Sequence, residues 1–234
     1  MNNVAHILKK ELKSYFVSPI AYIVISIFLI LAGWFFFTTF FIYNQAELRI
    51  FFALLPVLFS FIVPAVTMRL FSEEFNTGSF ELLMTMPVSS LDIIIGKFLA
   101  ATVFVAIMLL PTLAYAVTIS FIGDLDWGPV IGGYLGAVLM GGAFSSVGLF
   151  ASSLTRNQII SLIIGMAICF VLTLIDKMLF FLPVPVLNVF QYLGADYHFQ
   201  NIARGILDSR DIIYFLSVVF VMLYCTNLVI KEKI

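Results

Sequence analysis

The chain has 234 residues, of which 62% are apolar and 11% are charged, and its formal net charge is −1. A soluble domain carries about 25% charged residues, so this composition excludes an ordinary soluble protein and indicates an integral membrane protein. The near-zero net charge gives no indication of a nucleic-acid partner. Cys169 and Cys225 lie inside apolar runs, which argues against a disulfide framework or a metal cluster.

The chain opens with an amphipathic segment, residues 1–18. Its apolar side chains recur at helical spacing, and Lys9, Lys10 and Lys13 fall on the opposite face. This pattern predicts a helix that lies in the membrane interface, in contact with lipid. A cleavable signal peptide is the alternative, but the next apolar run is too long and lacks a small-residue cleavage site.

Six apolar stretches are long enough to cross a membrane, which takes about 20 residues in a helix. Only helices and closed barrels satisfy their backbone groups in lipid, and the stretches lack the alternation of barrel strands. We therefore expect an all-α integral membrane fold, a bundle of six transmembrane helices in a single domain of residues 1–234. The expected spans are residues 19–43, 50–68, 93–122, 129–154, 159–182 and 212–230.

The densest polar stretch of the chain, residues 69–92, lies between the second and third spans and carries Glu73, Glu74 and Glu81. Gly78 supplies a flexible break after its first half. The pattern predicts a helix, a break and a second short helix near the membrane surface. An ordinary solvated loop is the alternative.

The short helix after the break is expected to turn Phe80, Leu83 and Met84 to one side. Pro87 ends it, because proline cannot continue a helix. Ser90 is then expected to cap the helix of the third span.

The fourth span carries small residues at intervals of four, for example Ala137, Gly141 and Ser145. Such faces let helices approach closely in a membrane. A serine protease within the membrane is the alternative, but no histidine or lysine lies in the central part of a span to activate a serine. We therefore interpret this span as a packing helix.

The longest loop on the far side of the membrane begins with Pro183 and Pro185, which are expected to end the fifth span. Asp196 is expected to cap a short helix, and Asp208 with Asp211 resembles a capping box for the last span. The loop can re-enter the bundle or lie flat on the outer leaflet. The apolar stripe of its short helix comprises Phe199, Ile202, Ala203 and Ile206.

The distribution of lysine and arginine predicts the orientation, since cytoplasmic loops carry an excess of these cations. With both termini in the cytoplasm, the acidic segment lies there too. The cations on that side are Lys9, Lys10, Lys13, Arg69, Lys97, Arg156, Lys231 and Lys233. The opposite side holds the smaller set Arg49, Lys177, Arg204 and Arg210.

Several kinds of site are missing from the sequence. There is no GxxxxGK[ST] loop, because Gly96-Lys97 lacks the upstream glycine and is followed by Phe98. We therefore expect no nucleotide binding or hydrolysis, and no enzyme activity, in this chain. The two histidines, His6 and His198, leave no expected metal site. The middle of each span is uncharged, which disfavours a proton-driven pump.

The polar segment resembles a known cytoplasmic signature. Glu74, Gly78, Glu81, Leu83 and Pro87, followed by Gly96-Lys97, resemble the "E…GT.E.LL..P…GK" pattern of type-2 ABC exporter permeases, although Ser79 stands where threonine is common. The stretch "HFQNIARGILDSRDIIYFLSV" is similar to the "F..F.RG..D.RD..Y..S" segment of one branch. That branch contains the gliding-motility permeases (GldF-like) and the permease for nitrous-oxide-reductase maturation (NosY-like).

The resemblance implies a multi-pass subunit of the bacterial cytoplasmic (inner) membrane that binds no cofactor itself. Two cytoplasmic ABC ATPase subunits bind ATP and Mg²⁺ in such complexes, and a second permease chain, identical or related, completes them. An extracytoplasmic auxiliary subunit is a further expected partner. Residues 1–18 and 69–92 would face the ATPase, while residues 183–211 would close the external end.

The resemblance also implies roles for single residues. The acids of the polar segment would pair with basic groups of the ATPase, and its apolar residues would pack into a groove there. ATPase motion would then re-angle the second and third spans, with Pro56, Pro64 and Pro111 as candidate kinks or as static ones. The expected coupling residues are Glu73, Glu74, Gly78, Phe80, Glu81, Leu83 and Pro87, together with Met84.

Two alternatives to an exporter subunit stay open. The chain can serve as a membrane anchor that transmits ATPase motion to partners without moving a substrate. An ATP-independent channel or carrier is the other alternative, and it leaves the acidic segment unexplained. The apolar side chains of the spans are compatible with transport of a lipid-like cargo and equally with transport of no cargo.

Overall fold

The computed structural model describes residues 2–43, 48–85, 88–123, 125–178 and 192–233. Within these ranges the regular structure is helical and contains no strand. The helices are α1 (Asn2–Val17), α2 (Pro19–Tyr43), α3 (Arg49–Thr67), α4 (Arg69–Thr77), α5 (Ser79–Met84), α6 (Ser90–Leu109), the 3₁₀ turn η1 (Leu110–Thr112), α7 (Leu113–Ile122), α8 (Trp127–Leu154), α9 (Gln158–Met178), α11 (Ala195–Ala203) and α12 (Ser209–Glu232).

Among the described residues, six helical segments are long and apolar enough to cross a membrane, and together they confirm the expected all-α membrane fold. Pro183 and Pro185, and the end of the fifth predicted span, lie outside the described residues. The candidate spans are Pro19–Thr38, Arg49–Thr77, Ser90–Ile122, Trp127–Leu154, Gln158–Ile175 and Ser209–Glu232.

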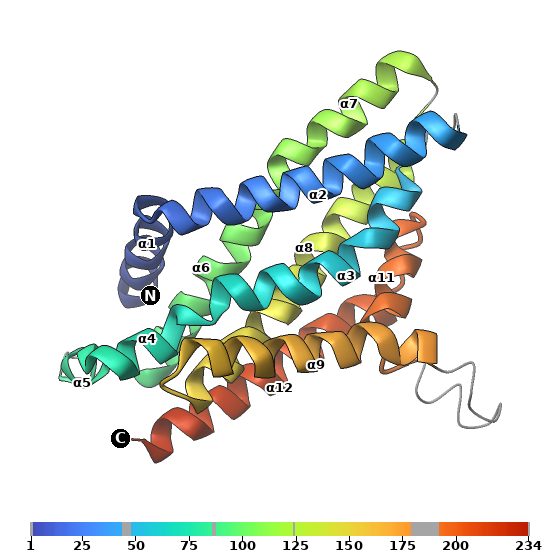
Figure 1. Ribbon diagram of the computed structural model, residues 1–234. Coiled ribbons are helices and arrows are strands. Elements are labelled where there is room, and N and C mark those ends of the chain that lie inside the picture. Colours follow the sequence, from blue (N-terminus) through green and yellow to red (C-terminus); the bar gives the residue numbers. More distant parts are fainter. Residues whose placement is uncertain (1, 44–47, 86–87, 124, 179–191, 234) are drawn as a thin grey trace.

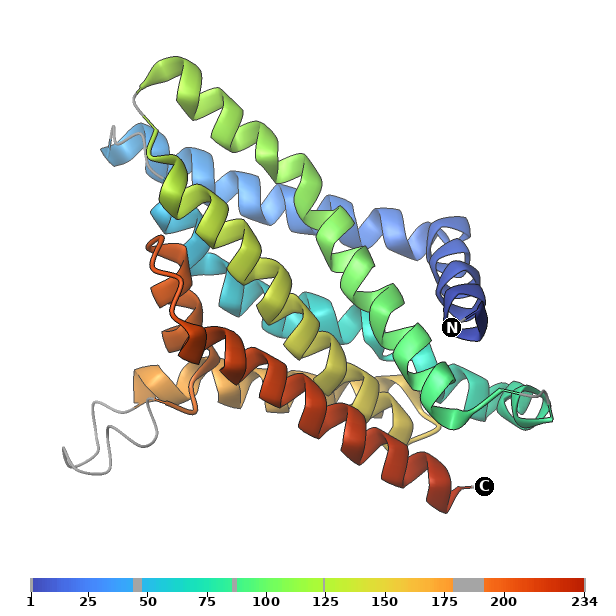
Figure 2. The same ribbon diagram turned by 180° about the vertical axis from the view of Figure 1, so that it is seen from behind.

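Helix α8 forms the centre of the bundle, with α3, α6, α9, α11 and α12 packed around it (Figures 1 and 2). Its glycines make these approaches possible. A Cβ atom at Gly133 would lie 2.4 Å from the Phe52 ring, and one at Gly141 would lie 2.6 Å from Val105 Cγ1. The predicted small-residue faces are therefore buried within the chain, where they cannot also hold a second permease chain.

The outer helices α2, α9 and α12 instead keep apolar side chains exposed. Trp34 on α2 is 71% exposed and Phe220 on α12 is 72% exposed. In a helix long enough to cross a membrane, such side chains contact lipid or another membrane protein, because both are as apolar as they are.

The second and third spans differ from the expected ones at their prolines. Helix α3 contains Pro56 and Pro64 and runs almost directly into α4, because the Met68 N–H donates to Pro64 O at 2.8 Å. The helical segment that contains the second span therefore continues through α4 to Thr77. In the third span Pro111 lies in η1, which separates α6 from α7. This break is the physical effect expected of a proline that cannot donate to the helix.

The two ends of the bundle carry different elements (Figure 1). Both termini, α1, α4 and α5 lie at one end, called here the terminal end. The distal end carries α11 and the connection between α7 and α8. Figure 2 shows the same separation from behind.

At the terminal end, α6 begins with a capping box formed by Ser89, not by Ser90 as expected. The Asp92 N–H donates to Ser89 Oγ at 3.1 Å, and the Ser89 N–H donates to Asp92 Oδ2 at 3.4 Å. The expected cap at Ser90 is one residue too late, because the side chain of either serine can accept such a bond. Ser90 Oγ instead lies 3.3 Å from Asn227 Oδ1 on α12.

At the distal end, α11 packs against α8, α3, α9 and α12. Phe199, Ile202 and Ala203 are buried as the predicted stripe requires, but Ile206 follows the helix and is 63% exposed. Asp208 caps α12 by accepting from the Arg210 N–H at 3.0 Å.

Two distal carboxylates differ from their predicted capping roles. Asp196 lies in the first turn of α11 instead of before it, and its carboxylate pairs with Lys177 of α9 at 3.3 Å. Asp211 completes no capping box, because its side chain pairs with His198 at 2.6 Å. Both acids therefore join elements of the distal end to each other.

Candidate functional site

The polar segment folds into a hairpin of two short helices, α4 and α5. Gly78 joins them with a φ of +72°, in the left-handed region that favours glycine. A Cβ atom there would meet nothing within 4 Å. The glycine is therefore required by the backbone conformation and not by a lack of space.

The hairpin is held from inside by aromatic rings. Phe80 of α5 is only 6% exposed, and its ring centroid lies 4.7 Å from that of Phe75 and 6.3 Å from that of Phe71, both on α4. The expectation that Phe80 packs into a groove of a partner is therefore corrected. Its burial within the chain makes it a support of the hairpin.

The exposed face of α5 presents other residues. Glu81 is exposed, Leu82 is 69% exposed, and Leu83 is partly buried against the same aromatic cluster. An exposed leucine beside an exposed carboxylate suits contact with another protein. The side chain of Met84 and the whole of Pro87 lie outside the described residues.

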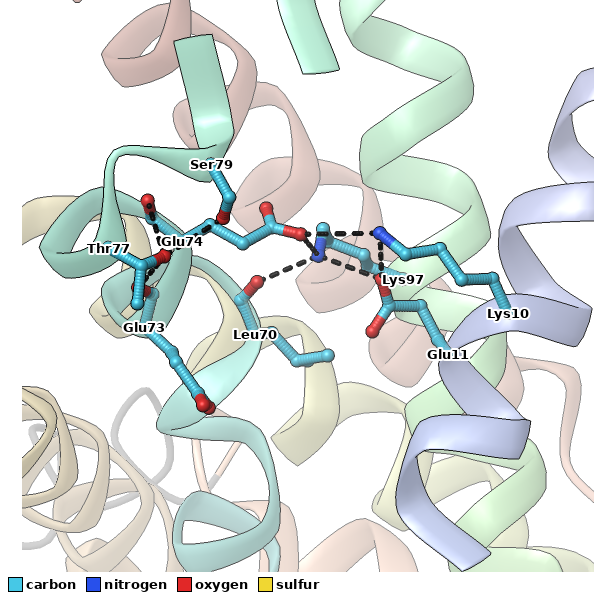
Figure 3. Close-up of polar contacts among 8 residues, drawn as sticks. All are labelled: Lys10, Glu11, Leu70, Glu73, Glu74, Thr77, Ser79 and Lys97. Atoms are coloured by element: carbon cyan, nitrogen blue, oxygen red, sulfur yellow. Dashed lines mark hydrogen bonds and ion pairs between the residues drawn. The ribbon is translucent and has the colours of Figure 1, made fainter. Parts of the chain in front are cut away.

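A buried lysine ties the hairpin to the rest of the terminal end (Figure 3). Lys97 of α6 is 1% exposed, and its Nζ donates to Glu74 Oε1 of α4 at 2.7 Å and to Glu11 Oε1 of α1 at 3.0 Å. The third donation goes to Leu70 O at 2.8 Å. All three donors of the ammonium are thus used, and the Phe71 ring centroid lies 5.2 Å away. We call Lys97, Glu11, Glu74 and Leu70 the Lys97 tie.

The residue before this lysine lets α1 approach α6. A Cβ atom at Gly96 would lie 2.7 Å from Ile7 Cγ2 and 3.3 Å from Val4 O. Only glycine therefore fits under α1 without displacing it. The dipeptide Gly96-Lys97 thus does two things, since the glycine admits α1 and the lysine binds it.

The acids of the hairpin are engaged within the chain to different degrees. Glu73 pairs with Arg69 at 2.8 Å one helical turn away, and the Glu73 side chain is 41% exposed. Glu74 is only 16% exposed and belongs to the Lys97 tie, with Lys10 at 3.9 Å. A change at Glu74 therefore disturbs the inside of the chain before any surface. Glu81 is the acid that best reports on a partner.

The C-terminal end of α12 also contacts the hairpin. Lys233 Nζ donates to Ser153 O of α8 at 2.5 Å and lies 4.3 Å from the centroid of the Phe75 ring on α4. Burial lowers the pKa of the Lys233 ammonium, with the nearby Arg156 acting in the same direction. The hairpin therefore has contacts with α1, α6, α8 and α12.

The sequence predicted the hairpin but not the Lys97 tie, the buried contacts that hold the hairpin to α1 and α6. Lys97 was expected as a cytoplasmic cation and as part of the Gly96-Lys97 signature, and neither Glu11 nor Leu82 was expected to belong to the site. The Gly96-Lys97 dipeptide of the signature was the available signal for Lys97. No local pattern pairs it with Glu11, which lies 86 residues away.

Chemically, this arrangement can transmit movement better than it can bind a reactant. A buried ammonium shared by two carboxylates fixes three helices relative to one another, because moving α6 away from α1 and α4 would leave its buried charge unpaired. Among the described residues, no group of three His, Cys, Asp or Glu side chains is placed to hold a metal ion.

Comparison with known proteins places the chain in a family. No curated protein matches its sequence. The family described as ABC-2 family transporter protein matches residues 43–194. This match covers more than half of the chain, including α3 to α8 with the hairpin and Lys97. The chain belongs to the ABC-2 family of transporter proteins.

Proposed function

We propose that the chain is the permease subunit of an ATP-driven exporter or mechanically coupled complex of the bacterial inner membrane, with both termini in the cytoplasm. Membership of the ABC-2 family supports the permease role and implies an ABC ATPase partner. The chain has no nucleotide-binding motif of its own, so ATP hydrolysis is assigned to that partner. The gliding-motility branch is the proposed relationship, on the strength of the residues from His198 to Val218.

The proposed contact with the ATPase is the exposed face of α5. Glu81 pairs there with a basic group, and Leu82 enters an apolar depression. Phe80 and Leu83 support this face from within, while Gly78 sets its angle. The proposed contact differs from the sequence hypothesis in its apolar anchor, which is Leu82 in place of Phe80.

The observation that carries the proposal is the Lys97 tie. A hairpin attached only by its ends would move without moving the bundle. Here Glu74 of the hairpin and Glu11 of α1 bind the same ammonium on α6. Displacement of the hairpin is therefore passed to the third span and to α1 together.

The proposed complex holds two ATPase subunits and a second permease chain, identical or related. The glycines of α8 give this assembly no support, since they are buried within one chain. The exposed apolar faces of α2, α9 and α12 are available for contact with the second permease chain. An extracytoplasmic auxiliary subunit would bind at the distal end.

The test is reconstitution of the chain with its cognate ATPase. Glu81→Lys and Leu82→Ser should each reduce the amount of ATPase that copurifies by roughly tenfold, the effect of losing one charge-assisted or anchoring contact. Leu207→Ser is the matched control, because Leu207 is 58% exposed at the distal end. Normal ATPase binding by both α5 variants would refute the proposed contact.

The same preparation separates the candidate functions. Substrate flux in sealed vesicles identifies an exporter. Stimulation of the ATPase without flux identifies a non-transporting anchor that transmits force. Flux that persists without the ATPase would identify a channel or carrier and would contradict both.

A further inference from the structure

A pocket of about 240 Å³ opens beside the Lys97 tie, between α1, α2, α3, α4 and α6. Charged side chains line one part of it, among them Lys10, Arg69 and Glu74, and apolar side chains line the other. All of its lining residues belong to the described part of the chain. The permease role assigned above leaves this space unused.

The polarity of the wall changes in one direction. Along α3 and α4 the lining runs from Ala65 and Val66 to Arg69 and then to Glu73 toward the terminal end. On α6 it runs from Phe104 to Lys97 in the same direction. A membrane leaflet has the same order, with tails at depth and headgroups at the surface. The pocket therefore matches the two parts of a lipid.

Glu74, one of the residues that line the pocket, has a buried oxygen that lacks a hydrogen-bond donor in the described part of the chain. Glu74 Oε1 accepts from Lys97, but Glu74 Oε2 is buried and has no hydrogen-bond partner within the described residues. A buried carboxylate oxygen without a partner is costly. Lys97 cannot supply the bond, since its three donors are used.

Two cations, Lys10 and Arg69, also line the pocket. Lys10 is 61% exposed, and the side chain of Arg69, bound to Glu73, is 31% exposed. They balance neighbouring carboxylates and can also receive an anion. A ligand that carries both an ammonium and a phosphate would therefore satisfy both parts of the polar wall.

We propose that this pocket binds a phospholipid with a primary ammonium headgroup, as in phosphatidylethanolamine, from the leaflet at the terminal end. The ammonium donates to Glu74 Oε2, and the phosphate lies near Lys10 and Arg69. The glycerol and the first acyl carbons contact Ala65 and Val66. This site stands independently of the proposed function.

The chemistry of the headgroup sets a selectivity. A primary ammonium has three N–H donors, whereas the quaternary ammonium of phosphatidylcholine has none. Phosphatidylglycerol carries no cation and brings its negative charge toward Glu11, Glu73 and Glu74. Phosphatidylethanolamine should therefore bind roughly tenfold more tightly than either, the effect of one charge-assisted hydrogen bond.

The experiment is a titration of the purified full chain in detergent, followed by native mass spectrometry, with the three lipids at matched acyl chains. Glycerophosphoethanolamine, which lacks acyl chains, is a fourth probe. Tighter binding of phosphatidylethanolamine than of all three others is the expected result. Equal binding of the three lipids, or preference for phosphatidylglycerol, would overturn the proposal. Binding of the acyl-free probe as tightly as the lipid would overturn the lipid as ligand.

A pair of variants locates the site. Ala65→Phe fills the pocket and should abolish the preference for phosphatidylethanolamine. Ala53→Phe is the control, because Ala53 lies on the same helix, is exposed and does not line the pocket. If Ala65→Phe keeps the full preference, the lipid binds elsewhere and the proposal fails. Should Ala65→Phe not fold, the selectivity of the unmodified chain still decides between the outcomes.

Discussion

Both ends of the bundle bury a charged contact. The two contacts differ in how far apart their partners lie in the sequence. Lys97 at the terminal end binds carboxylates that lie 86 and 23 residues away in the sequence. His198 at the distal end binds Asp211, 13 residues away, and the Tyr192 carbonyl, 6 residues away. The terminal contact therefore fixes three distant helices, whereas the distal contact closes a local turn between α11 and α12.

The number of hydrogen-bonding atoms in each side chain matches the number and arrangement of its partners. The Lys97 ammonium has three donors and can hold three acceptors from different directions. The His198 ring has two nitrogens in one plane. Its Nε2 lies 2.9 Å from the Tyr192 carbonyl oxygen, which can only accept, and its Nδ1 lies 2.6 Å from Asp211 Oδ1. The ring also stacks on Tyr214 with centroids 4.1 Å apart.

This difference predicts that a substitution in the terminal contact affects several helices, whereas a substitution in the distal contact has a local effect. Disturbing Lys97 should affect α1, α4 and α6 together. Disturbing His198 or Asp211 should affect α11 and the start of α12. Four substitutions test this difference between the two contacts.

The largest effect is expected from Lys97→Met, which removes the buried cation and leaves Glu11 and Glu74 with only the exposed Lys10, at 3.8 and 3.9 Å. Breaking a buried ion pair in this way costs about 3–5 kcal/mol of folding stability. The measurement is the free energy of unfolding in detergent. Replacing Glu11 and Glu74 with leucine in the same chain should recover most of the loss, because an apolar triad leaves no unpaired charge. A single variant as stable as the triple one would contradict the tie.

A smaller and more local effect is expected from Asp211→Asn. It removes one charge-assisted hydrogen bond, which contributes about 1.5–3 kcal/mol. Hydrogen exchange should rise in residues 195–203 and stay unchanged in α1 and α4. Asp208→Asn is the control, since asparagine caps a helix as well as aspartate does. Faster exchange across the terminal end would contradict the local character of this contact.

Gly96→Ala tests the approach of α1 to α6. The added methyl meets Ile7 at 2.7 Å, and such overpacking costs about 1–3 kcal/mol. Ile7→Ala in the same chain should restore stability. Gly142→Ala is the control, because its Cβ atom would lie an ordinary 3.6 Å from Thr102 Cγ2. Equal stabilities of the two glycine variants would show that α1 is not held closely.

The smallest effect is expected from Gly78→Ala, which forces a side chain into the left-handed region. The cost is about 1–2 kcal/mol, and it should appear in thermal unfolding of the purified chain. Asn at the same position should cost less, because its side chain can hydrogen-bond locally in this conformation. If alanine is tolerated fully, the hairpin turns without needing the left-handed conformation.

The hairpin shows how far a sequence pattern reaches. Gly78 between a polar segment and a short apolar run predicted the break, and the structure has a left-handed residue there. The same pattern could not say which side of α5 faces inward. Phe80 was assigned to a partner, but Phe71 and Phe75 of the preceding helix cover it. Six residues of α5 are too few for a periodicity to distinguish an inner face from an outer one.

The polar contacts also divide into those that the sequence predicts and those that it does not. Asp208 as a cap was predictable, because the bond joins residues two positions apart. Asp211 could also have capped α12, and only the position of His198 on α11 decided otherwise. The glycines of α8 predicted close packing, but their partners Phe52 and Val105 come from helices that the sequence does not place.

The helical membrane fold, the six long apolar segments and the position of the polar hairpin can be predicted from the sequence, because hydropathy and glycine or proline breaks act over a few adjacent residues. Which charges meet depends on the packing of helices that are distant in the sequence. Lys97 could have faced water like the other terminal lysines, since nothing next to it in the sequence requires burial. Close packing at Gly96 brings Glu11 within 3.0 Å, and the turn into α4 brings Glu74 within 2.7 Å. Long-range packing, and not local sequence, thus determines where the buried charge lies.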